Sequence, residues 1–250
     1  STTDLLDAIA NQITVLSENL SISGVGFACP GPLDAGNGTI FGTPNLTLLE
    51  NCPIKKEMEK RLNLPCLIEN DANLFALGEC WDYSGKKDVF TGITLGTGLG
   101  FGIIINGQLF TGAHGMAAEY GISPVQWGKW ETAISIDGII SPYKENSGVE
   151  ITPRDLKEMA DKGDRTALIV WNDFGEKLGI CLTHLINMLD PDAISIGGGI
   201  SHAFVHFKRS MTETIKNHSP AYNHYTIDIF ESVEKEISAK RGAAMLLISS

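Results

Sequence analysis

The sequence predicts an α/β protein in which helices cover a parallel sheet. Two observations lead to this prediction. Apolar residues alternate between helical spacing and short unbroken runs, so that residues 4–81 give the order helix, strand, helix, strand, helix. The chain also has 250 residues, of which 43% are hydrophobic and 20% charged, so it can bury a sizeable core and is not predominantly disordered.

The first predicted helix covers residues 4–20, where apolar side chains recur every three or four positions behind a cap at Thr3 or Asp4. Residues 25–28 form a short strand, and the Cys-Pro-Gly-Pro sequence that follows stops it in a turn. The later elements of this half are a helix over 54–62, a strand over 65–69 and a helix over 72–81.

A polar stretch at residues 83–87 marks a predicted domain boundary. It divides a small α/β lobe, residues 1–86 completed by the C-terminal helix 238–250, from a large α/β lobe, residues 87–237. In the large lobe, Asn106-Gly107 is the signature of a tight hairpin turn. Its other predicted elements are strands over 89–95, 102–105, 193–196 and 226–230, helices over 165–189 and 204–217, and a final helix from residue 239.

Charge and cysteine content exclude several classes of protein. The formal net charge of −11 argues against a general electrostatic grip on nucleic acid or anionic lipid, although a local basic pocket for a phosphate stays open. The five cysteines are too widely spaced for a structural zinc site, which favours reduced thiols and a cytoplasmic protein. Neither a signal sequence nor an apolar run of membrane-spanning length is recognisable, so no membrane association is expected.

The densest candidate site lies at residues 95–102, where Gly occupies every second position after a strand. Backbone amides at Gly96, Thr97 and Gly98 would approach a phosphate without a side chain in the way. The alternative is a glycine-rich turn between two packed strands, and the pattern alone does not separate the two. It is not the dinucleotide fingerprint, because a strand and not a helix follows it.

A second candidate site is residues 69–73 (ENDAN), which follow a buried strand at the position where open α/β sheets bind ligands. A carboxylate at Asp71 would orient and deprotonate a substrate hydroxyl for attack on a phosphoryl group. The competing interpretation of Asp71 is a helix cap before Ala72.

Other residues are weaker candidates. The Gly197-Gly198-Gly199 turn would admit a nucleotide base or phosphate, or is simply a flexible loop. His114, Glu119 and Glu131 are candidates by neighbourhood only. Trp127 and Trp130 form either a sugar-stacking surface or, more in line with their setting, a packed corner.

Taken together and in this order, these segments resemble the ROK family, which contains bacterial sugar kinases and sugar-responsive repressors. The residues that carry the resemblance run over most of the chain: 30–32 (PGP), 43–46 (TPNL), 69–73 (ENDAN), 78–79 (GE), 95–98 (LGTG), 112–115 (GAHG), 119–121 (EYG), 190–192 (DPD) and 197–199 (GGG). The resemblance implies a two-lobed actin-like ATPase fold, related to ribonuclease H. It also implies a homodimer as the common assembly.

The resemblance assigns roles to individual residues. Asp71 would be the general base that activates a hexose hydroxyl, usually the 6-hydroxyl, for transfer of the γ-phosphoryl group of ATP with Mg²⁺. Asn45, Asn70, Glu119 and Glu131 would hold sugar hydroxyls. The turn from Gly96 to Gly98 would face the phosphates, and Gly198-Gly199 would lie near the adenosine.

Three departures from the family pattern bear on function. Ile122 stands where the family has a histidine after Gly121, and an aliphatic side chain neither hydrogen-bonds a sugar nor binds zinc. The cysteine-rich zinc loop that normally follows is replaced by residues 126–131, so no structural zinc is expected. The amino-terminal strands of the small lobe, with their Asp-x-Gly-Gly-Thr phosphate loop, are also missing from this sequence, which leaves a sheet edge exposed.

Two functions follow as hypotheses. The first is an ATP-dependent hexose kinase with Asp71 as base, for a glucose-like sugar. The alternative is a non-catalytic sugar-binding regulator or pseudokinase, which Ile122 and the missing phosphate loop favour. A third possibility is a subunit whose role is association.

Overall fold

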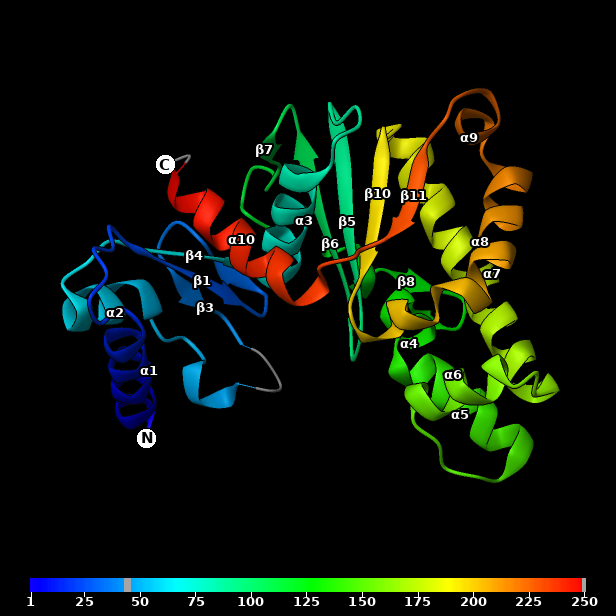
Figure 1. The fold of residues 1–250 in the computed structure, drawn as a ribbon, viewed down its shortest axis with the longest axis horizontal. Coiled ribbons are helices and arrows are strands. Elements are labelled where there is room, and N and C mark those ends of the chain that lie inside the picture. The colour runs from blue at the N-terminus through cyan, green and yellow to red at the C-terminus, as the bar shows by residue number, and fades with distance from the viewer. Residues whose placement is uncertain (43–45, 249–250) are drawn as a thin grey trace.

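The computed structural model describes residues 1–42 and 46–248, apart from the side chains of residues 146, 235 and 236. The fold contains two main sheets, seen on the left and in the centre of Figure 1. The smaller sheet pairs β1 (Val25–Cys29) in parallel with β4 (Cys66–Asn70), so that both strands end at the same edge. Helices α1 (Thr2–Leu16) and α2 (Ile54–Leu62) pack beside this sheet and bury Leu6 and Met58 in its core.

The larger sheet has five strands in the order β11-β10-β5-β6-β7. β5, β10 and β11 run parallel, whereas β5, β6 and β7 form an antiparallel meander. The strands are β5 (Val89–Leu95), β6 (Leu99–Ile105), β7 (Gln108–Leu109), β10 (Ala193–Gly197) and β11 (Asp228–Glu231). This arrangement leaves the ends of β5 and β10 side by side.

Opposite faces of the larger sheet pack on different helices, because side chains alternate along each strand. On one face, Ile93 and Leu95 join a core with α7 (Arg165–Leu189) and α8 (Phe204–His218). The helices α7 and α8 approach closely, since a Cβ at Gly175 would lie 2.5 Å from the Phe207 carbonyl oxygen. The other helices of this region are α4 (Trp130–Ala133), α5 (Ile136–Ser147), α6 (Pro153–Asp161) and α9 (Pro220–His224).

The opposite face of the larger sheet packs on α3 (Asp71–Asp82), the helix that follows β4. Glycines allow this close approach: a Cβ at Gly92 or Gly102 would lie 2.7 Å or 2.6 Å from the Ala76 Cβ. The last helix, α10 (Lys235–Ile248), crosses α3 and also packs on β1, as the red helix of Figure 1 shows. The helices α3 and α10 therefore join the two sheets. The lobe boundaries at residues 86 and 237 remain our proposal.

Most of the predicted elements are confirmed, several to the residue. The bounds of α2, β5 and α7 are those predicted. The hairpin between β6 and β7 turns on Asn106 and Gly107, both of which have a positive φ.

Several details of the sequence-based prediction were wrong. Ser1, and not Thr3 or Asp4, caps the first helix, which ends at Leu16. The helix α5, which contains Pro142, and the helix α6 were not predicted. β6 begins at Leu99, three residues before the predicted start, and β11 begins at Asp228 and not at residue 226.

The remaining short elements are two hairpins and three turns of 3₁₀ helix. The hairpins join β2 (Leu33–Asp34) to β3 (Thr39–Ile40) and β8 (Pro124–Val125) to β9 (Gly128–Lys129), and the 3₁₀ turns are η1 (Thr47–Leu49), η2 (Glu119–Ile122) and η3 (Gly199–Ala203). All five cysteine thiols are buried and unpaired. Of the helices that the structure describes, none is long and apolar enough to cross a membrane.

Candidate active site

The junction of β4 and α3 places Asp71 at a helix N-terminus. The Asn70 side-chain oxygen caps α3 by accepting hydrogen bonds from the backbone N–H of Ala72 at 2.9 Å and of Asn73 at 3.3 Å. Asp71 is the first residue of the helix, and its carboxylate also accepts from the Ala72 N–H, at 2.9 Å. Because Asn70 performs the capping, the cap interpretation of Asp71 does not account for a carboxylate at this position.

Asp71 opens onto a cleft of about 350 Å³ at the carboxyl ends of the parallel strands. These ends are where open α/β sheets place their ligands. The segments that follow β1, β4, β5 and β10 all contribute to the lining. The lining residues include Pro30, Gly31, Asn70, Asp71, Thr94, Gly96, Thr97, Gly98, Glu119, Glu131 and Gly198. The cleft therefore brings together residues from six separate parts of the sequence.

The glycines of residues 96–102 serve two purposes: some face the cleft, as a phosphate-binding turn would, and others allow close packing. A Cβ at Gly96 would meet nothing within 4 Å, so the backbone there faces open space. Gly100 and Gly102 lie in β6, and a Cβ at Gly100 would lie 2.6 Å from the Ala72 Cβ of α3. The turn from Gly96 to Gly98 thus lines the cleft, whereas the last two glycines serve strand-to-helix packing.

Gly198 lines the cleft beside the turn that follows β5. Its φ of 84° is one that residues other than glycine rarely adopt, and a Cβ there would lie 2.7 Å from the Leu95 backbone nitrogen. The turn after β10 therefore contacts the turn after β5 closely. Two adjacent turns whose glycines expose the backbone form a surface suited to phosphate groups.

Two carboxylates, from Glu119 and Glu131, line the same cleft as Asp71. A Cβ on Gly31 would lie 2.7 Å from the Asn70 Nδ2 and 3.2 Å from a Glu119 carboxylate oxygen, so these groups converge on the Gly31 backbone. Partial burial, followed by the charges of Glu131 and Asp71, raises the pKa of Glu119. Carboxylates and an amide gathered in this way are suited to hold the hydroxyl groups of a sugar.

The Asp71 carboxyl group is exposed to the cleft, yet many protein atoms surround it. These atoms remove water from the carboxylate, and this loss of hydration is the largest cause of the raised pKa of Asp71. Hydrogen bonds from the backbone N–H groups of Ala72 and Asp71 act in the opposite direction and lower the pKa. Burial, reinforced by the nearby charge of Asp71, also raises the pKa of the Cys29 thiol to about 11. A carboxylate with a raised pKa is a better proton acceptor.

Other candidate residues lie outside this cleft. Gly199 lines a neighbouring cavity of about 430 Å³, together with Arg154, Lys157 and His202. His114 is exposed and does not line the cleft. Asn45 lies outside the described residues.

The two tryptophans pack against each other. Trp130 is 2% exposed and meets Trp127 edge-on at 6.1 Å between ring centroids, which supports the packed-corner interpretation.

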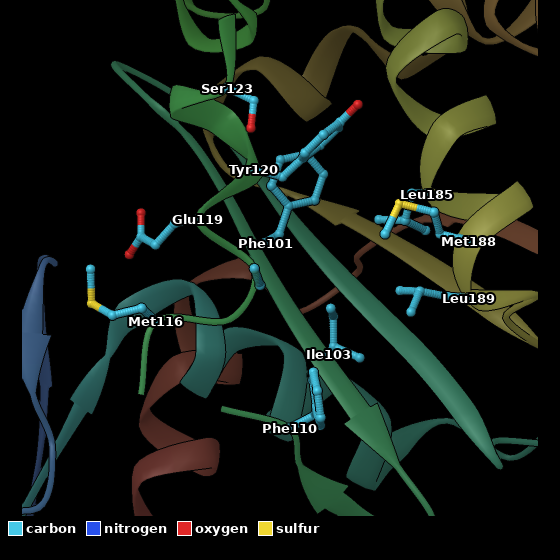
Figure 2. Close-up of a pocket in the computed structure, with 11 residues that line it drawn as sticks. Phe101, Ile103, Phe110, Met116, Glu119, Tyr120, Ser123, Leu185, Met188 and Leu189 are labelled. Atoms are coloured by element: carbon cyan, nitrogen blue, oxygen red, sulfur yellow. The ribbon is translucent and has the colours of Figure 1, made fainter. Parts of the chain in front are cut away.

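A third cavity, of about 350 Å³, lies beside Glu119 between β6 and α7 (Figure 2). Its lining is mainly apolar and includes Phe101, Tyr120 and Leu185. Glu119 lines both this cavity and the cleft, and Figure 2 shows its carboxylate turned away from Leu185.

Sequence reasoning did not assign a role to Pro30 and Gly31, although both line the cleft. It used residues 30–32, the turn after β1, as the end of a strand and as one motif of the family resemblance, without a role in the site. The usable signal was the position of that turn at the carboxyl end of a parallel strand, which is the same signal that identified Asp71.

Comparison with known proteins agrees with the resemblance in the sequence. The family model described as the ROK family matches residues 1–250. The chain belongs to the ROK family. Its fold is the two-lobed actin-like ATPase fold of ROK sugar kinases. A crystal structure of a ROK family glucokinase from Streptomyces griseus, in complex with glucose and AMPPNP, superposes with a TM-score of 0.84 at 27% identity and covers 99% of this chain and 88% of that one.

Two ROK relatives differ in their described function. A glucokinase from Halalkalibacterium halodurans is 33% identical over 250 residues, covering 88% of this chain and 74% of that protein. A xylose repressor from Caldicellulosiruptor bescii is 31% identical over 252 residues, covering 91% of this chain. This chain spans 63% of the length of that repressor, which is less than two thirds.

The ROK departures take definite positions in the structure. Ile122 is 51% exposed at the end of η2 and is not among the residues that line the cleft. Residues 126–131 form β9 and the start of α4, anchored by the buried Trp130. Within the described part of the chain, no three His, Cys, Asp or Glu side chains are grouped to hold a metal ion.

Proposed function

We propose that this chain forms the catalytic part of a ROK sugar kinase that transfers the γ-phosphoryl group of ATP to a hexose, at the 6-hydroxyl of a glucose-like sugar. Its relatives and structural neighbours include glucokinases. The observation that carries the proposal is the position of Asp71. Its carboxylate opens onto the same cleft as the glycine turns at Gly96–Gly98 and Gly198.

The proposed reaction needs little covalent chemistry from the protein. Asn70, Glu119 and Glu131, with Asn45, would hold the sugar hydroxyls so that one hydroxyl faces Asp71. As that oxygen forms its bond to the γ-phosphorus, its proton passes to the Asp71 carboxylate, and the bond from the γ-phosphorus to the bridging oxygen of ADP breaks.

The nucleotide would lie against the two glycine turns of the cleft. The Gly96 backbone faces open space, and Gly198 adopts a conformation that excludes a side chain, so both turns can approach phosphates closely. Gly199 and the cavity beside it would take the adenosine. Mg²⁺ enters with ATP and neutralises charge on the phosphates when bound.

The proposal is tested by measuring ADP release from MgATP over a panel of hexoses, with the complete protein that carries this chain and with Asp71→Ala as the control. We expect turnover with at least one hexose, lost in the Asp71→Ala protein. If no hexose is turned over while one still binds, the kinase proposal fails.

The pH dependence of kcat/KM is a second expected result. A base must be unprotonated to accept a proton, so activity should fall as the pH drops through the raised pKa of Asp71, with a midpoint above the ordinary value for Asp. This acidic decrease should be present in pH profiles of kcat/KM for the hexose that are measured at saturating MgATP. Activity that stays constant or rises on acidification would contradict the role of Asp71.

A second candidate function is a non-catalytic sugar-binding regulator. The similarity to a xylose repressor and the replacement of the family histidine by Ile122 favour it. A regulator predicts sugar binding that Asp71→Asn leaves unchanged and no ATP turnover in the complete protein. The homodimer also stays a prediction, which light scattering of the complete protein checks.

A further inference from the structure

A buried carboxylate lies on α3 two turns beyond Asp71. Glu79 is only 7% exposed and faces the region where α3, α10 and the strands β10 and β11 meet. It does not line the cleft and has no place in the proposed reaction.

Three serine hydroxyls donate hydrogen bonds to the Glu79 carboxylate. Ser195 of β10 donates to one oxygen at 2.5 Å. Ser232, which follows β11, donates to the other oxygen at 2.8 Å, and Ser238 of α10 donates to that same oxygen. One side chain therefore links two helices and two strands.

A buried carboxylate is a costly way to stabilise a fold. A buried carboxylate loses its hydration and must recover that free energy from its hydrogen bonds. Well-packed apolar groups at such positions are often as stabilising as the charged cluster that they replace. Unlike apolar contacts, the hydrogen bonds of the carboxylate are directional, so each serine hydroxyl fixes the position of its own element relative to α3.

We infer that Glu79 is a positioning residue that fixes α3, and with it Asp71, relative to the nucleotide-facing turn after β10. This inference rests on the proposed kinase function. Ser195 lies three residues before Gly198 on the same strand and turn, and Asp71 lies eight residues before Glu79, or about 12 Å along the helix. The Glu79–Ser195 hydrogen bond thus connects the sugar-facing base to the phosphate-facing glycine through two rigid elements.

The consequence for catalysis follows from geometry. A base and a phosphoryl donor held by different elements must keep their separation in the transition state. A misplacement of about 1 Å can lower the rate roughly 10²-fold. Binding of each substrate separately depends much less on that separation, so the effect should fall on kcat and not on KM.

The test compares Glu79→Gln and Ser195→Ala with Asp82→Asn in the complete protein. Asp82 is a matched control, since it lies on the same helix and links α3 to Arg241 of α10, but at the surface. For Glu79→Gln and Ser195→Ala we expect kcat to fall about 10-fold to 100-fold, with KM for hexose and for MgATP within about threefold of the unmodified protein. Asp82→Asn should leave all three parameters within about twofold.

The double variant gives a further readout. Because Glu79 and Ser195 act through one hydrogen bond, Glu79→Gln combined with Ser195→Ala should lower kcat no further than the more damaging single variant. Melting temperatures measured in parallel separate loss of position from loss of fold. Should Glu79→Gln fail to fold, Ser195→Ala decides the question, because it leaves two serine donors on the carboxylate.

Two outcomes would overturn the inference. The first is an unchanged kcat in both variants while the unmodified protein turns over a hexose, which leaves the proposed function standing. The second is a loss of kcat only in proportion to the fraction unfolded, which makes Glu79 structural. Absence of turnover by the unmodified protein would instead refute the proposed function and this inference with it.

Discussion

Replacing Asp71 with Asn is expected to lower kcat for sugar phosphorylation by at least about 10²-fold, because a positioned general base contributes roughly 10² to 10⁴ to the rate. Asn has nearly the shape of Asp but cannot accept the proton of a sugar hydroxyl at neutral pH. The cap of α3 is kept, since the Asn70 oxygen provides it. The loss should therefore reflect chemistry and not folding.

Stability provides an internal check on this prediction. The folded state raises the pKa of Asp71, so the folded protein holds the proton more tightly than the unfolded chain. The ionised form consequently disfavours folding at pH values above the raised pKa, and this penalty disappears as the pH falls below the unfolded value. Removing the charge by Asp71→Asn at neutral pH should leave the melting temperature unchanged or slightly higher.

The measurement is steady-state ADP release with the preferred hexose, alongside hexose binding by calorimetry. Asp82→Asn serves as the control, because it makes the same chemical change on the same helix at a surface ion pair. We expect Asp71→Asn to bind hexose with an affinity close to that of the unmodified protein. A kcat above one tenth of the unmodified value would refute Asp71 as the base.

The position of Asp71 could be predicted from sequence because its signal is local. A short apolar strand, a polar cluster and a helix follow one another within residues 65–81, and the carboxyl end of a parallel strand is a ligand-binding edge. Glu119, Glu131 and Gly198 are different, since only the strand order brings them to that edge. The glycine turn made Gly198 a candidate and neighbourhood made Glu119 and Glu131 candidates, but their roles came only from the family resemblance.

The glycine-rich segment shows where a sequence pattern stops being informative. Alternating glycines fit both a phosphate-facing turn and a strand that packs closely on a helix. The contacts of Gly100 and Gly102 with Ala72 and Ala76 separate the two, and these partners lie on an element more than 20 residues earlier.

Glu79 is a more extreme case of a non-local arrangement. Its three serine partners are 116, 153 and 159 residues away in sequence, so no local pattern indicates the cluster. In the sequence, Glu79 stands out only through the Gly78-Glu79 pair that belongs to the family resemblance, and that pair does not indicate its serine partners.

The second large effect is expected at the crossing of α3 and α10, where two glycines allow backbone contact. A Cβ at Gly78 would overlap the Ser238 carbonyl oxygen, and a Cβ at Gly242 would overlap the Leu74 carbonyl oxygen. Rigid helix backbone cannot yield as a flexible side chain does, so Gly78→Ala must push the two helices apart. That movement would also disturb the packing of α10 on β1 and the Ser238 hydrogen bond to Glu79.

We expect Gly78→Ala to destabilise the protein by about 3 kcal/mol, at the upper end of the usual cost of overpacking. In a domain of this size that corresponds to a decrease in melting temperature of about 6 to 12 °C. Thermal and urea denaturation measure it, with Gly199→Ala as the control, because a Cβ at Gly199 would meet nothing within 4 Å.

Combining Gly78→Ala with Gly242→Ala shows whether the two glycines act on the same helix contact or independently. Once Gly78→Ala has separated the helices, a second methyl group at Gly242 meets a wider gap, so the combined loss should be smaller than the sum of the single losses. A Gly78→Ala protein that melts within about 2 °C of the unmodified protein would mean that the helices separate at little cost. In that case the approach of α3 to α10 is not what sets the relative position of the two sheets.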